Sequence, residues 1–172
     1  MTPDQALFLL NATLGSLKLE SRVTAAVLRA VPMERSDYRP DDVGKTAMEL
    51  VRHIAVADIR FNSVVPLGVF DVQGAGIPDD VATPQEVATW YEQEFARVFE
   101  LLTKATPEQL TKSVDFRGMF QQPAIWYLTL GLHHTIHHRG QLSSYLRSMG
   151  GKVPAIYGES YDSAQAKKAA TS

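Results

Sequence analysis

Residues 123–150 read PAIWYLTLGLHHTIHHRGQLSSYLRSMG. Pro123 favours the first position of a helix, and Gly150 with Gly151 favours its end. The stretch between them therefore predicts one long helix, which at 1.5 Å per residue spans about 40 Å. Four of the five histidines of the chain lie near its middle, at positions 133, 134, 137 and 138. A helix of this length needs partners of similar length to bury its apolar face.

Helix start signals earlier in the sequence predict three such partner helices. Thr2-Pro3 matches a helix N-cap followed by its first residue, and the capping boxes Thr46–Glu49 and Thr83–Glu86 precede apolar residues at helical spacing. The predicted helices are 3–31, 46 to about 63–66, and 83–104.

The connecting segments contain the proline and glycine residues. Loops are predicted at 32–44 and 67–80, and a mixed stretch with one short turn at 106–122. Since no segment shows convincing strand alternation, we predict an all-α four-helix bundle. The bundle is expected to form a single domain over 1–158, with 159–172 as a frayed C-terminal tail.

Composition excludes several classes of protein. The 172 residues include 17 basic and 19 acidic side chains, so no basic nucleic-acid footprint is expected. Without any cysteine, the chain has no disulfide, no thiolate nucleophile and no Cys-ligated metal. The N-terminus lacks a signal-peptide pattern, and no apolar stretch approaches the roughly 18 residues of a membrane span. The expected location is the cytoplasm, without a membrane or nucleic-acid partner.

Helical periodicity separates the histidines into two pairs. His134 and His138 lie about 40° apart around the helix and border its apolar face, whereas His133 and His137 lie on a face that meets a partner or solvent. His53 flanks the apolar stripe of the helix that starts at Thr46. The apolar residues that define the face bordered by His134 and His138 are Tyr127, Leu142, Tyr145 and Leu146.

An i,i+4 histidine pair and one histidine from a neighbouring helix can converge on a single metal ion in a bundle. Neutral imidazoles suit zinc, nickel, copper or iron, and three of them leave positions open for water or substrate. The alternative is that these are hydrogen-bonded core histidines, which is the commoner role of a single histidine such as His53.

Two motifs resemble the DinB-like (DinB/YfiT) four-helix-bundle family. Residues 133–141, HHTIHHRGQ, are followed by Leu146-Arg147 and Gly150, as in the closing helix of that family. Arg39-Pro40, followed by the segment Thr46–Ile54 with its single histidine, resembles the family's second signature.

The resemblance implies an up-down-down-up bundle and a homodimer. It also implies a divalent metal, such as zinc, nickel, manganese or iron, held by His53, His134 and His138. Some family members transfer a low-molecular-weight thiol to an electrophile, so the resemblance makes metal-dependent thiol S-transfer on a small-molecule substrate the leading hypothesis. A metal-dependent hydrolase and a non-catalytic, stress-related metal-binding protein are the alternatives.

Other polar residues receive weaker predictions. Asp58 is expected to be an exposed or structural acid, with a general base as the less favoured role. Arg139 is expected to form a salt bridge or a dimer contact, and Gln141 to orient a liganding imidazole or to pack. Tyr157 is a candidate for covering the mouth of a pocket. Glu20, on the first helix, cannot be placed from the pattern.

Overall fold

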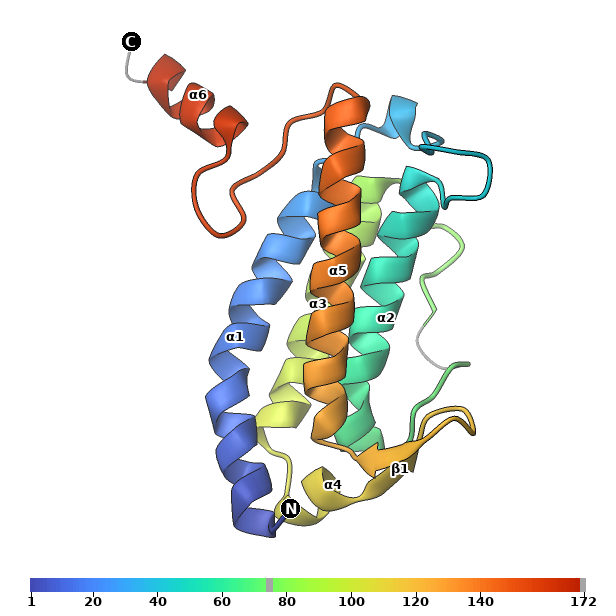
Figure 1. Ribbon diagram of the computed structural model, residues 1–172, viewed down its shortest axis with the longest axis vertical. Coiled ribbons are helices and arrows are strands. Elements are labelled where there is room, and N and C mark those ends of the chain that lie inside the picture. Colours follow the sequence, from blue (N-terminus) through green and yellow to red (C-terminus); the bar gives the residue numbers. More distant parts are fainter. Residues whose placement is uncertain (74–75, 171–172) are drawn as a thin grey trace.

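Four long helices form the body of the protein (Figure 1). The computed structural model describes residues 1–73 and 76–170. α1 and α5 run in one direction and α2 and α3 in the other, which gives the up-down-down-up order. Their bounds are α1 Pro3–Arg29, α2 Ala47–Leu67, α3 Pro84–Thr103 and α5 Trp126–Ser148. The prediction of a helical bundle is confirmed.

The helices form a closed ring around one core. α2 packs against α5 and α3, and α1 packs against α3 and α5. Because α2 and α3 are parallel, the chain between them must return along the length of the bundle, which accounts for the long predicted loop at 67–80. Among the described residues, no helix is both long and apolar enough to cross a membrane.

The predicted N-termini are confirmed by their caps. Thr2, Thr46 and Thr83 each accept a hydrogen bond from the backbone N–H three residues later, and the side chain at that third position bonds back to the cap. Each box satisfies backbone donors that the first turn of a helix leaves free. The same arrangement at Thr106 starts the short helix α4, Pro107–Thr111, where one turn was predicted.

The predicted start of the last helix at Pro123 is wrong. Strands β1 (Ser113–Asp115) and β2 (Gln121–Pro123) pair antiparallel as a hairpin, and α5 starts only at Trp126. The N–H groups of Ala124 and Ile125 donate to the carbonyls of Lys112 and Leu110, so they hold the chain to α4 and the hairpin instead of opening a helix.

Two smaller helices complete the described chain. A 3-10 turn, Met33–Arg35, follows α1, and α6, Tyr161–Ala170, lies within the range expected to be a tail. Asp162 attaches α6 to the bundle by an ion pair of 2.7 Å with Arg147 and by accepting the N–H of Val153. None of the side chains of α6 is buried.

Helices α2 and α5 approach each other closely at Gly131. An ideal Cβ built on Gly131 would clash with the Cβ of Phe61, so only glycine lets the two backbones approach this closely. The contact lies one turn before His134, and it therefore sets the distance between the helices beside the histidines.

Gly131→Ala is expected to lower the free energy of unfolding by about 1–3 kcal/mol, because the added methyl group must push α2 away from α5. Gly140→Ala is the matched control, since nothing lies within 4 Å of an added Cβ there. Gly140→Ala should raise the free energy of unfolding by up to about 1 kcal/mol, because alanine has a higher helix propensity than glycine at this exposed position. Urea unfolding measures both variants, and equal effects would contradict this account.

Candidate metal site

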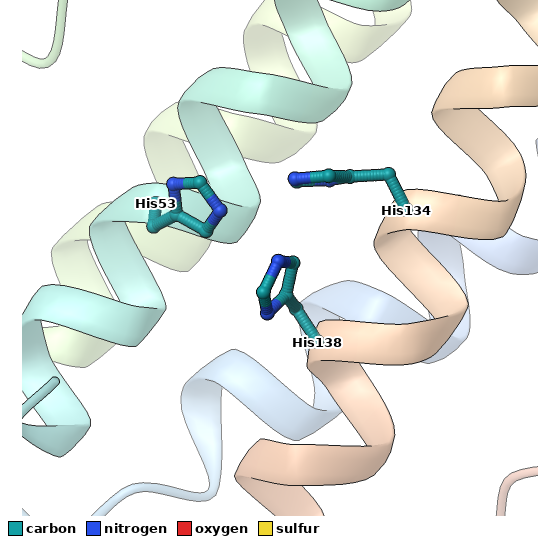
Figure 2. A group of neighbouring side chains, drawn as sticks. All are labelled: His53, His134 and His138. Carbon is teal, nitrogen blue, oxygen red and sulfur yellow. The ribbon is translucent and has the colours of Figure 1, made fainter. Parts of the chain in front are cut away.

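Three histidine side chains meet between α2 and α5. His53 extends from α2, and His134 and His138 extend from successive turns of α5, so that the three rings face one another (Figure 2). Their potential ligand atoms all lie within 4.8 Å of one another. The ring centroids are 4.5–5.0 Å apart. The structure thus brings together the three residues that the sequence selected.

The other two histidines lie outside this cluster. His133 and His137 are exposed, whereas His53, His134 and His138 are half-buried. Each residue advances about 100° around a helix, so His133 and His137 are turned away from α2 when His134 and His138 face it.

Burial keeps the imidazoles of His53 and His134 neutral. Burial is the main cause that lowers the pKa of His53 from its ordinary 6.5 to about 4, and positive charge on His138 and Lys45 adds to it. Burial and the neighbouring histidines likewise lower the pKa of His134 to about 4. At pH 7 both rings therefore keep the lone pair that a metal ligand requires.

Gln141 fixes the orientation of His138. Its amide Nε2 donates to the hydroxyl of Tyr145 at 3.2 Å, which leaves its Oε1 to accept from His138 Nδ1 at 3.1 Å. In the tautomer in which Nδ1 donates this hydrogen bond, Nε2 of His138 is left as an acceptor. This agrees with the orienting role that the sequence analysis considered for Gln141.

The chemistry of the donor set fits a divalent metal. Among the described residues no carboxylate bonds to any of the three rings, and His134 Nδ1 is buried without a hydrogen-bond partner. Buried polar atoms are normally satisfied, so this orphan is typical of a site completed by a group from outside the chain. The three imidazole nitrogens could hold one metal ion.

A cleft of about 540 Å³ opens beside the cluster, with His53 and His134 in its wall. The α2 side contributes Ala57 and Arg60, and the hairpin loop contributes Phe116 and Arg117. The histidines are therefore accessible to a small molecule, and a substrate bound here would lie between α2 and the hairpin.

Asp58 does not belong to this site. It is only 5% exposed and accepts hydrogen bonds from Tyr91 at 2.7 Å and Thr135 at 2.8 Å. Burial raises the pKa of its carboxyl group above the ordinary value, although these hydrogen bonds oppose the shift. The structural role is the one observed, and the alternative of an exposed acid is wrong.

Arg139 forms the salt bridge expected of it, with a partner that the sequence pattern did not identify. Its side chain is 2% exposed, and one guanidinium nitrogen lies 2.5 Å from the carboxylate of Glu20 on α1. A second nitrogen donates to the hydroxyl of Tyr157 at 2.7 Å. Tyr157 thus braces this pair. It lines a hollow formed by residues 153–160 and does not line the cleft beside the histidines.

Comparison with known proteins agrees with the fold and the motifs. The sequence model of the DinB family matches residues 8–169. The chain belongs to the DinB family. Two uncharacterized Bacillus subtilis (strain 168) proteins are similar to it in sequence. YjoA is 27% identical over 130 residues, which cover 74% of this chain and 82% of YjoA. YrdA is 32% identical over 108 residues, which cover 58% of this chain and 64% of YrdA.

Crystal structures of DinB-like proteins share the fold. The one from Bacillus cereus ATCC 10987 superposes with a TM-score of 0.72 at 25% identity, covering 86% of this chain and 97% of that one. The structure of YjoA gives a TM-score of 0.69 at 24% identity, covering 86% of this chain and 98% of that one. The up-down-down-up arrangement is therefore that of DinB-like proteins.

Gln141→Leu is expected to release the proton of His138 from Nδ1, because leucine offers no acceptor, whereas Gln141→Glu keeps one. Nitrogen-15 NMR of the metal-free protein at pH 7.5 distinguishes the two ring tautomers. The wild type and Gln141→Glu should show the Nδ1–H form, and Gln141→Leu a shift toward Nε2–H. The same tautomer in all three proteins would refute the positioning role.

Proposed function

We propose that His53, His134 and His138 bind one divalent metal ion and that this site transfers a low-molecular-weight thiol to an electrophile. The observation that carries the proposal is the convergence of three imidazoles at the wall of an accessible cleft. Depressed pKa values at His53 and His134 support it, since these side chains need not lose a proton at pH 7 in order to ligate.

A divalent ion on three neutral ligands keeps its positive charge and lowers the pKa of a thiol bound beside it. The chain itself positions the ligands. His53 is fixed by α2, and His138 is fixed by its bond to Gln141. A substrate would reach the three histidines through the cleft, because buried residues surround their other sides.

The reacting sulfur must come from the small molecule, because the chain contains no cysteine. In the proposed reaction the thiol gives its S–H proton to solvent. The sulfur lone pair then forms a carbon–sulfur bond with the electrophile, and the leaving group departs with the pair from the bond it breaks.

Hydrolysis has less support from the structure. A metal-dependent hydrolase commonly uses a nearby carboxylate as general base, and Asp58 is enclosed by Tyr91 and Thr135. Glu49 is a carboxylate in the cleft wall, but its Oε2 accepts the N–H of Thr46 as part of the α2 cap.

The test is thiol-dependent consumption of monobromobimane, with N-acetylcysteine as the thiol. Zinc-loaded wild type is expected to accelerate formation of the thioether at least about tenfold over thiol and zinc alone. His53→Ala should lose this acceleration, and His133→Ala, whose side chain is exposed, should retain it.

Equal rates with and without bound zinc would refute thiol transfer. Turnover of 4-nitrophenyl acetate without thiol would then favour the hydrolase. A zinc-loaded protein inactive in both assays would favour the non-catalytic metal-binding protein.

A further inference from the structure

Two arginines line the same cleft as the histidines. Arg60 follows His53 by seven residues on α2, which is about two turns or roughly 10 Å along the helix, so it shares the face of His53. Arg117 belongs to the loop of the β1–β2 hairpin. α2 runs toward this hairpin (Figure 1), and both arginines line the cleft.

Neither guanidinium group has a carboxylate partner within 4 Å among the described residues. The Nε of Arg60 is buried and has no hydrogen-bond partner there. By contrast, Arg52 in the same wall donates to the carbonyl of Val81 at 2.8 Å. Arg60 is half-buried, and buried polar atoms are normally satisfied, so its unpartnered Nε indicates a position that a bound group could complete.

Arg117 has a backbone conformation that residues other than glycine rarely adopt. Its φ is +57°, in the left-handed region, and the following Gly118 has a φ of +76°. The Oδ2 of Asp115 accepts the N–H of Gly118 at 2.7 Å and so supports this turn. Strained residues of this kind concentrate at ligand-binding sites, and here the turn presents Arg117 to the cleft.

Aromatic rings line the same cleft. Phe70 lies 4.6 Å from Phe116 and 5.2 Å from Phe61, measured between ring centroids. Phe61 in turn lies 5.4 Å from the ring of His134. The cleft thus joins nitrogen ligands, an apolar wall and two arginines that have no carboxylate partner in the described part of the chain.

We propose that this cleft binds a small organic carboxylate, with the carboxylate on Arg60 and Arg117 and its apolar body against the phenylalanines. A planar guanidinium group matches a carboxylate through paired hydrogen bonds, which makes arginine suited to this recognition. The cleft wall carries four cations, Lys45, Arg52, Arg60 and Arg117, against the single acid Glu49, so its net charge also favours an anion. The carboxylate site does not rest on the proposed function; only a contact between the other end of the ligand and a metal ion on the histidines would rest on it.

Binding of 4-methylbenzoate and of its neutral analogue 4-methylbenzamide to the metal-free protein tests the carboxylate site. By calorimetry at pH 7.5, the benzoate is expected to bind at least about tenfold more tightly. Arg60→Gln and Arg117→Gln should each remove this preference. Arg97→Gln is the matched control, because it removes one positive charge from the exposed side of α3. Thermal unfolding of each variant verifies that it is folded.

Equal affinity for the two compounds, a preference that survives in both cleft variants, or the same loss in Arg97→Gln would overturn the proposal. A second titration separates it from the proposed function. Cobalt-loaded protein is titrated with 4-(mercaptomethyl)benzoate, and sulfur binding to the ion is read from a near-ultraviolet charge-transfer band. A benzoate preference without that band would support the carboxylate site and contradict thiol binding at the metal.

Discussion

Close packing of α2 against α5 is the constraint on which the candidate site depends. Gly131 removes the side chain that would separate the two helices at Phe61, and His134 follows one turn later. His53 can then face His134 and His138 across a short gap, with potential ligand atoms within 4.8 Å. A helix pair set further apart by one methyl group would still form a bundle, but it would hold the three imidazoles less closely.

The rotation of α5 about its own axis is fixed by two buried polar contacts beside the histidines. Thr135 and Arg139 each follow a histidine of the cluster by one residue, and both are buried. Thr135 bonds to Asp58, and Arg139 pairs with Glu20 of α1. Burying such groups is costly, and their better-attested benefit is specificity of arrangement rather than stability. In this protein they link α1, α2 and α5, so that a turn of α5 by even one residue would break both contacts and move the histidines away from α2.

Local sequence patterns predicted the parts of the structure that depend on local interactions. The capping boxes gave the starts of α2 and α3, and the 100° step gave the faces of His134, His138 and Gln141. The start of α5 was predicted wrongly because the proline signal at Pro123 competes with pairing in a hairpin whose strands are only three residues long, too short to show periodicity. The pairing of Arg139 with Glu20 joins residues 119 positions apart, which no local pattern contains. The arginines of the cleft were missed for the same reason, since Arg60 and Arg117 lie 57 positions apart in the sequence and line one cleft only in the folded chain.

The central claim is that three particular histidines hold one metal ion. Its most direct test is the metal content of untagged protein, purified without nickel resin and measured by inductively coupled plasma mass spectrometry. Wild type is compared with His138→Ala and with His137→Ala, the adjacent exposed residue. The account predicts about one ion per chain in wild type and in His137→Ala, and none in His138→Ala. The absence of an ion from wild type even after addition of zinc and dialysis, or equal loss in the two variants, would contradict it.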